Sequence, residues 1–306
     1  RFVSGEDADI FTEAEEDTLD QVEAKEDLYR EWLEEGAHRD EVCALNVWTA
    51  GFFVPLTEST YRRVPTSGTL VDLATSVPIS NYQGAVDAAA ETAERLTFFH
   101  RTLEFPDVFA GNRDGFDVVL SNPPCERIKL QDQEFFAGRD LEIAQAPNKA
   151  ARDRLIRALR MAPEGESPDP SRVALADAHD AAKHDAEAGS LFARKSGRFP
   201  LGGVGDVNTY ALFAELGRDL ISSRGRTGIV VPTGIATDNT YREFFADLND
   251  RQALVSLYDF ENRKKLFDAV DGRMKFSLLT MAGSPVERGD FAFYLTEPSQ
   301  LDDAQR

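Results

Sequence analysis

The chain has 306 residues, 42% of them hydrophobic, and a formal net charge of −20 at pH 7. Its length and composition are typical of a globular protein, and no apolar run approaches the roughly 20 residues of a membrane span, so we expect no membrane partner and, without a signal peptide, a cytoplasmic protein. Two cysteines and four histidines without paired spacing argue against a disulfide framework and a structural zinc site, and no metal is expected.

The first part of the chain is acidic and predicted to be helical. Residues 1–40 hold 15 Asp or Glu against 4 Lys or Arg, so they carry most of the net charge. An apolar stripe predicts an amphipathic helix over residues 12–35, and helical patterns continue over 41–53 and 86–99. The negative charge is unfavourable for DNA binding, because affinity for duplex comes largely from neutralised phosphates, but the rest of the chain is nearly balanced.

The stretch that ends in Asn-Pro-Pro-Cys is the most informative one. Residues 118–120 form a short apolar run, which is typical of a strand buried on both faces. Pro123 and Pro124 end that strand and hold Asn122 extended. Ligands of an open parallel sheet bind outside the carboxyl ends of its strands, so Asn122 is expected to face a crevice. The side-chain carbonyl of Asn122 and the backbone carbonyl of Pro123 are then two acceptors suited to an exocyclic amine.

Downstream, helices over residues 148–161 and 171–188 are predicted to form a hairpin that interrupts the sheet. Asp206 is the expected N-cap of a later helix, and Asp238 that of another. The first hairpin helix carries four arginines at helical spacing, each a candidate phosphate contact: Arg152, Arg154, Arg157 and Arg160. The predicted strands cover residues 117–120, 228–231, 254–260 and 275–281.

Several motifs carry a family resemblance when they are taken together and in order. They lie at residues 98–100, 103–109, 116–125, 126–130, 134–136, 196–200, 205–213, 228–234 and 260–267. In combination they resemble the adenine-specific DNA methyltransferases of restriction-modification and phage-exclusion systems, over about residues 41–283. The resemblance implies an α/β fold with the Rossmann-like sheet of S-adenosylmethionine-dependent methyltransferases, in which the four predicted strands correspond to the fourth through seventh.

The activity implied by the resemblance is methyl transfer from S-adenosyl-L-methionine to N6 of an adenine flipped out of double-stranded DNA. Two carbonyl acceptors would position the amino group, which is preorganised electrostatic catalysis. The implied catalytic residues are Asn122, Pro123, Pro124 and Cys125, and the implied cofactor contacts are Asp117 and Asn122. The expected DNA contacts are Arg127, Lys129, Arg198, Arg263, Lys264 and Lys265, of which the last three are favoured because they follow a strand in a family-like segment.

The chain departs from the family at two places. Cys125 stands where the family has an aromatic residue that stacks on the extruded base, a contact worth about 1–3 kcal/mol. No Gly-rich cofactor loop follows a strand upstream of Asn122, and the glycine cluster at residues 202–205 does not follow a strand. We therefore expect a fragment with only the second half of the sheet, whose partners are duplex DNA and the missing cofactor half and target-recognition region of the same or a companion polypeptide.

Two alternatives stay open at this point. The chain could be a non-catalytic DNA-binding or assembly piece of a split or degenerate methylase, which is the interpretation favoured by Cys125 and the absent loop. Pro-Pro-Cys also resembles the nucleophile loop of cytosine-C5 DNA methyltransferases, with Cys125 as the nucleophile. Those enzymes need a Glu-Asn pair on the next strand, and the pair here, Glu261 and Asn262, lies far downstream.

The predicted organisation follows from these motifs. It comprises an acidic helical segment (1–56), a linker and helix leading into the sheet (57–115), the catalytic strand and loop (116–138), a helical insertion (139–200), the second half of the sheet (201–296) and a tail (297–306).

Overall fold

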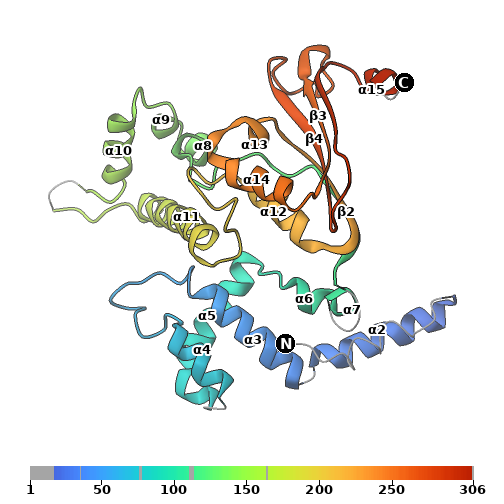
Figure 1. The fold of residues 1–306 in the computed structure, drawn as a ribbon. Coiled ribbons are helices and arrows are strands. Elements are labelled where there is room, and N and C mark those ends of the chain that lie inside the picture. The colour runs from blue at the N-terminus through green and yellow to red at the C-terminus, as the bar shows by residue number, and fades with distance from the viewer. Residues whose placement is uncertain (1–16, 35, 76–77, 110–113, 163–164, 305–306) are drawn as a thin grey trace.

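The centre of the molecule is an open, mixed sheet of five strands in an α/β arrangement, which is compatible with a Rossmann-like fold (Figure 1). The structure is a computed structural model and describes residues 17–34, 36–75, 78–109, 114–162 and 165–304. The strands are β1 (Phe116–Ser121), β2 (Ile221–Pro232), β3 (Leu254–Glu261), β4 (Lys275–Ala282) and β5 (Asp290–Leu295), in the spatial order β1-β2-β4-β3-β5.

Strand direction brings the ends of four strands to one edge. β1 runs parallel to β2, and β3 runs parallel to β5. β4 is antiparallel to both β2 and β3, between which it lies. The carboxyl ends of β1, β2, β3 and β5 therefore share one edge of the sheet with the start of β4, and Asn122 follows the first of these ends. This is the edge at which an open α/β sheet binds its ligands.

The four predicted strands are confirmed, with two differences. β2 begins at Ile221, seven residues before the predicted start at 228. The run from Ser222 to Thr227 is polar and gives no strand pattern, although Arg226 and Thr227 pair with Val118 and Val119 of β1. β5 was not predicted. β5 lies at the outer edge of the sheet, where Phe291 and Phe293 are about half exposed. Its sequence does not show the apolar and polar alternation that identifies a half-buried strand.

Helices precede the sheet and are inserted into it. Before β1 come α2 (Leu19–Glu34), α3 (Gly36–Ala50), α4 (Ser67–Ala74), the short 3-10 turn η1 (Ile79–Tyr82), α5 (Gln83–Leu96), α6 (Arg101–Glu104) and α7 (Pro106–Phe109). The helix predicted from residue 12 begins in the structure at Leu19, and its first residues up to 16 lie outside the described part. Figure 1 shows these helices on one side of the sheet, with the insertion extending from another.

The insertion between β1 and β2 has its own small core. It contains α8 (Asp132–Ala137), α9 (Leu141–Ala144), α10 (Lys149–Ala158) and α11 (Pro170–Lys195), followed by α12 (Thr209–Leu220). Asn148 caps α10 and Asp169 caps α11, each by accepting a hydrogen bond from a backbone amide of the first turn. Phe136, Ile143, Leu159 and Ala176 pack together inside it. Arg152 is buried there and donates to the carbonyls of Ile143 and Ala146, so its prediction as a phosphate contact was wrong.

One face of the sheet is covered by α12, α13 (Gly234–Thr237) and α14 (Arg242–Asp250), with the 3-10 turn η2 (Asn239–Tyr241) between the last two. The main core forms there, where side chains of β2, β3 and β4 meet Tyr210, Phe244 and Leu248. The 3-10 turn η3 (Asn262–Lys264) follows β3, and α15 (Gln300–Ala304) follows β5.

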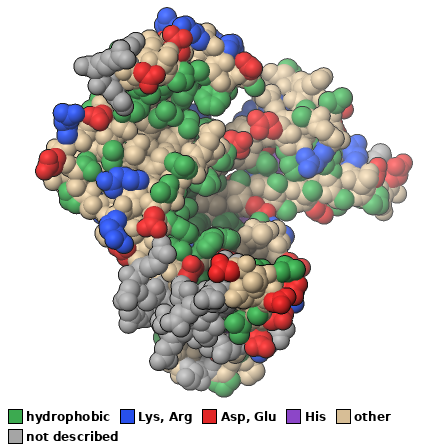
Figure 2. All heavy atoms as spheres, turned by 90° about the vertical axis from the view of Figure 1, so that its right-hand side faces the viewer, with side chains coloured by type: hydrophobic (Ala, Val, Ile, Leu, Met, Phe, Trp, Pro, Cys, Tyr) green, Lys and Arg blue, Asp and Glu red, His purple; other side chains and the backbone are tan. Residues whose placement is uncertain are grey.

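The opposite face is partly open, which corrects the prediction for β1. Val118 and Leu120 are 61% and 80% exposed, so β1 is an edge strand and is not buried on both faces. The Leu120 side chain lies over Gly228, where an added Cβ would meet it at 2.8 Å. Figure 2 shows hydrophobic side chains gathered along the middle of the side that faces right in Figure 1.

The N-cap of α12 is Asn208, and the prediction of Asp206 was wrong. The chain stays extended past Asp206 because Val207 accepts a hydrogen bond from the Ile128 amide at 3.0 Å and Asn208 pairs with Arg127. The helix can start only after this pairing ends. Asp238 does act as a cap, but of η2, which leads into α14.

Candidate functional site

The turn after β1, here called the Asn-Pro-Pro corner (residues 122–124), is tied to the start of α12. Pro124 accepts a hydrogen bond from the Thr209 hydroxyl at 2.5 Å, and the Glu126 amide donates to the same hydroxyl at 3.0 Å. The Thr209 amide in turn donates to the Glu126 carbonyl at 2.9 Å. The fixed φ of the two prolines and the hydrogen bond to Pro124 restrict the corner, and the other two bonds hold Glu126 just after it.

Of the two acceptors that the sequence assigned to this corner, the Asn122 amide is exposed and Pro123 is buried. Asn122 is exposed, and its side chain makes no hydrogen bond to any residue in the described ranges. The Pro123 carbonyl accepts only from the Cys125 thiol, at 3.6 Å, which is a weak interaction. The corner therefore presents the Asn122 amide to the solvent at the carboxyl end of a parallel strand, whereas Pro123 is buried. Asp117 is also exposed, but it is the second residue of β1 and lies at the opposite end of the strand from the corner.

Cys125 is exposed, and its thiol is a poor nucleophile. Partial burial, with a smaller contribution from the Glu126 carboxylate, raises the pKa of the Cys125 thiol. A thiol with a raised pKa is protonated at neutral pH, whereas a catalytic cysteine needs the thiolate.

Two tyrosines lie behind the corner. Tyr210, in the first turn of α12, meets Tyr241 edge to face with ring centroids 5.5 Å apart. Burial, together with Tyr241, raises the pKa of Tyr210, and Cys125 is near enough to add to this effect. Tyr210 is buried in the main core. Its proximity to Cys125 could not be predicted from the sequence, because the two residues are 85 positions apart.

The predicted basic cluster lies at the far end of the same edge. Two strands separate β1 from β3, so at about 4.8 Å per step the corner and the cluster are roughly 14 Å apart. Arg263 pairs with Glu261, Lys264 pairs with Glu297 at 2.9 Å, and the Lys265 ammonium donates to the Val270 carbonyl at 2.8 Å. Lys275 also pairs with Glu261, at 3.1 Å, and is the main cause of the lowered pKa of that carboxyl. Arg263 and Lys264 are thus paired with carboxylates, whereas Lys265 is held by a carbonyl and keeps its charge.

Asn262 is fully occupied within its own loop. It is completely buried; its amide donates to the carbonyls of Phe267 and Val270, and its carbonyl accepts from the Phe267 amide, all at 2.9 Å. The Glu261 and Asn262 pair therefore shapes the loop after β3 and presents no free amide at the edge.

Of the other predicted DNA contacts, Arg127 and Lys129 follow the corner directly in the chain, whereas Arg198 lies near Arg101 and Asp219. Arg127 pairs with Asp206 at 3.5 Å, and Lys129 makes no ion pair with any residue that the structure describes. Arg198 lies in the loop between α11 and α12, where partial burial, and then the charge of Arg101, lower the pKa of its guanidinium. The structure thus brings Arg127 and Lys129 beside the corner and leaves the 263–265 cluster apart from it.

The glycine cluster at residues 202–205 is not a phosphate cradle. The amides of Leu201 and Gly202 donate to the buried carboxylate of Glu215, at 3.1 and 2.6 Å, and the Gly203 amide donates to the Phe199 carbonyl. An anion would need amides that are free. Glycine is required here for close packing, because a Cβ on Gly203 would meet the Ala193 carbonyl oxygen at 2.2 Å.

The residues present do not form a complete site for S-adenosylmethionine. Upstream of β1 the described residues form helices and turns but no strand, so the Gly-rich loop that would hold the cofactor's carboxylate is missing from this part of the chain. Of the two expected cofactor contacts, Asn122 lies exposed at the carboxyl edge of the sheet, whereas Asp117 lies at the amino end of β1, so the structure does not bring them together. Among the described residues no group of three His, Cys, Asp or Glu could hold a metal ion, and no helix is long and apolar enough to cross a membrane.

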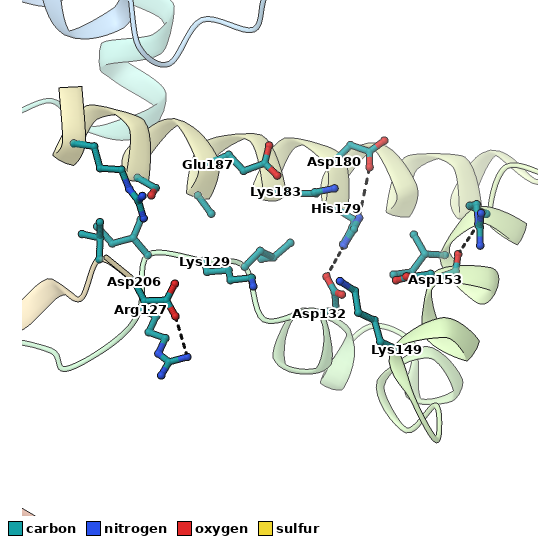
Figure 3. A pocket seen from close by; sticks show the side chains of 18 residues that line it. Arg127, Lys129, Asp132, Lys149, Asp153, His179, Asp180, Lys183, Glu187 and Asp206 are labelled. Carbon is teal, nitrogen blue, oxygen red and sulfur yellow. Dashed lines mark hydrogen bonds and ion pairs between the residues drawn. The ribbon is translucent and has the colours of Figure 1, made fainter. Parts of the chain in front are cut away.

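An open cavity of about 670 Å³ begins beside the corner (Figure 3). Its walls are the segment 127–132, which follows the corner, and the facing sides of α10 and α11. A second cavity, of about 640 Å³, lies along the other side of the same segment. Residues 127–131 therefore stand as an accessible arm between two hollows.

No family model matches the chain, and no curated protein is found to be similar to it. Its function is therefore argued from the corner and its surroundings.

Proposed function

We propose that the chain is the catalytic half of an S-adenosylmethionine-dependent DNA methyltransferase that acts on N6 of adenine, of the restriction-modification or phage-defence type. The observation that carries the proposal is the Asn-Pro-Pro corner. It follows a parallel strand at the ligand-binding edge, its backbone is restricted by two prolines and by the Thr209 hydroxyl, and it presents the exposed Asn122 amide next to the buried Pro123.

The strand order supports this assignment. Among β1 to β4, the last strand in the chain lies antiparallel between the second and the third. This is the arrangement expected of the fourth to seventh strands of a methyltransferase sheet, the positions that the motif resemblance gives them. α12 and α14 precede and follow β2 on one face, as expected for the second half of such a sheet.

The open edge of β1 supports the view that another piece completes the sheet. One side of β1 pairs with β2, and no strand of the described chain pairs with its other side. The exposed Val118 and Leu120 provide apolar area beside that edge. Burying a leucine or valine side chain contributes about 1.5–3 kcal/mol, so a companion half that covered both would gain several kilocalories per mole.

The chemistry assigned to this chain is positioning. The Asn122 side-chain carbonyl and the Pro123 carbonyl accept the two hydrogens of an extruded adenine's amino group, which turns the nitrogen lone pair toward the open edge. When bound, S-adenosylmethionine supplies the methyl group. The backbone oxygen cannot rotate away, and the prolines restrict Asn122, so neither acceptor has to reorganise.

The cytosine-C5 alternative is less well supported. It requires a reactive thiolate at Cys125, whose pKa is raised, and a free Glu-Asn pair near the corner, whereas Asn262 is buried and fully bonded. The second candidate that an observation favours is a non-catalytic piece of a split or degenerate methylase. Cys125 cannot stack on a base, which is the departure that favours it.

The test is adenine methylation by the chain together with the polypeptide that supplies the cofactor half, measured as transfer of a labelled methyl group to duplex DNA. We expect Asn122→Ala to lower the rate about 10²–10³-fold, as for the loss of one preorganised hydrogen-bonding group. Asn249→Ala, at an exposed position of α14, is the matched control and should leave the rate unchanged. Equal rates for the two variants would overturn the proposal, and no methylation by the wild-type pair would favour the non-catalytic candidate.

A further inference from the structure

The cavity beside the corner gathers most of the uncompensated lysines of the chain. Six basic side chains line it: Arg127, Lys129, Lys149, Arg157, Lys183 and Arg194. Of these, only Arg127 pairs with a carboxylate, whereas Arg157 and Arg194 donate to backbone carbonyls and keep their full charge. The three lysines make no ion pair with a described residue. In a chain of net charge −20, such a concentration needs an explanation.

The contrast with the cluster after β3 is informative. Lys264 and Lys275 are held by carboxylates, and Lys265 by a carbonyl. Lys129, Lys149 and Lys183 come from three separate elements and still point into one hollow, as Figure 3 shows. These lysines are far apart in the sequence, and folding brings them to the same cavity.

Most of the acidic side chains in the same cavity are already engaged. Asp206 pairs with Arg127, and Asp180 pairs with Arg160 at 2.9 Å. Asp132 accepts from the Nε2 atom of His179 at 3.0 Å. Asp153 and Glu187 make no ion pair with a described residue. Asp132 has no Lys or Arg partner, so the charges of the cavity that are not paired with an opposite charge of Lys, Arg, Asp or Glu are five cations and three carboxylates, and the cations are in excess.

His179 is the second feature that points to a ligand. It is only 5% exposed, it stacks on Phe136 with ring centroids 5.1 Å apart, and it lines the cavity. Its Nδ1 atom has no hydrogen-bond partner among the described atoms, and the Asp180 carboxylate lies 3.6 Å away. A buried ring nitrogen without a partner costs free energy unless a water or a ligand meets it.

We infer that this cavity holds the phosphodiester backbone of DNA next to the extruded base. The inference rests on the proposed function and extends it by assigning the DNA path. Arg127 and Lys129 lie three and five residues after Pro124, so a strand whose base sits at the corner passes directly along the arm and reaches Lys149 and Lys183. Lysine ammonium groups contact phosphates without regard to sequence, so the cavity fixes position on the duplex and not the target site.

The experiment measures the affinity of the full chain for an adenine-containing duplex oligonucleotide, by fluorescence anisotropy, as a function of salt. Each phosphate contact contributes about 0.9 to the slope of log K against log salt, so Lys149→Ala/Lys183→Ala should lower the slope by about 2. The ratio of the wild-type binding constant to that of this variant should then fall about tenfold between 50 and 200 mM salt. Lys195→Ala is the control, because Lys195 is exposed on the same helix α11 but does not line the cavity.

Each outcome decides a separate point. An unchanged slope for the double variant, or an equal loss for Lys195→Ala, overturns the assignment of the cavity, and so does tighter binding of an RNA of equal length. Adenine methylation that stays intact alongside an unchanged slope leaves the proposed function standing and removes only the DNA path. A reduced slope without any methylation by the completed enzyme supports the cavity and refutes the catalytic role.

Discussion

Glu215 offers the sharpest test of how the loop before α12 is held. Its carboxylate is fully buried and accepts from the amides of Leu201 and Gly202. In Glu215→Ala both donors lose their acceptor in a site that water does not reach. At about 1–3 kcal/mol for each unsatisfied buried group, and allowing for relief of the buried charge, we expect a loss of about 2–5 kcal/mol in the free energy of unfolding.

The pH dependence of this loss follows from the pKa of Glu215. Burial raises that pKa above its value in the unfolded chain, and the two amide hydrogen bonds oppose this only in part. The folded state then binds more protons than the unfolded state between the two pKa values. The contribution of the side chain is therefore full below the unfolded pKa and declines as the pH rises through the folded pKa. Glu215→Gln does not titrate, so the stability difference between wild type and this variant should be larger at pH 5 than at pH 8.

Urea denaturation followed by circular dichroism at both pH values measures these differences. Glu243→Gln is the control, because Glu243 is an exposed residue of α14 that pairs only with its neighbour Arg242, and its effect should stay within about 0.5 kcal/mol. A Glu215→Ala variant as stable as the wild type would refute the role assigned to the two hydrogen bonds. A wild-type stability advantage over Glu215→Gln that grew from pH 5 to pH 8 would refute the direction of the pKa shift.

Two further predictions concern the corner and the open strand. Cys125→Trp should strengthen binding of an extruded base by about 1–3 kcal/mol, measured as a lower dissociation constant in a fluorescence titration of a 2-aminopurine duplex. Cys125→Ser should leave the methylation rate unchanged, because the proposed reaction does not use the thiol as a nucleophile. Weaker binding by Cys125→Trp would count against a base at the corner. Val118→Ser/Leu120→Ser should change the free energy of unfolding of the isolated chain by less than about 1 kcal/mol, because both side chains are largely exposed. The same variant should associate more weakly with the cofactor half, measured by co-purification. Full association of this variant would exclude β1 as the joining edge.

Local sequence was sufficient for the strands that carry a short apolar run and for the corner, where two prolines dictate the backbone. It failed for the start of β2 and for β5, because their pairing depends on neighbours and not on their own pattern. The apolar residues of β1 were expected to be buried, and Leu120 instead lies exposed over Gly228.

As with the strands, the parts of the site that depend on local sequence could be predicted, and those that depend on long-range contacts could not. Asn122 and its prolines follow from local chemistry, whereas the pairing state of each cation depends on residues distant in sequence. Lys264 pairs with Glu297, whereas Lys149 and Lys183 pair with no carboxylate of the described residues. The local sequence does not distinguish these three lysines. The basic cluster that sequence favoured is thus the more compensated one, and the tyrosine pair behind the corner joins two separate helical segments.

The hydrogen bonds between residues 126–128 and 207–209 have a consequence for the whole insertion. Arg127 pairs with Asn208, Ile128 with Val207, and Glu126 with Thr209, so the chain leaves and re-enters the body of the protein through one short stem. Beyond that stem lie α8 to α10, whose core includes Phe136, Ile143 and Leu159. α11 is also held from the other side, because Phe192 packs against Trp48 and Phe53, and Asp185 pairs with Arg95 at 2.5 Å. Because the entropy of closing a loop grows only slowly with its length, α8 to α10 could be shortened, extended or exchanged without moving the strand that ends at Ser121. The surface that this segment adds could therefore change while the Asn-Pro-Pro corner stays as it is.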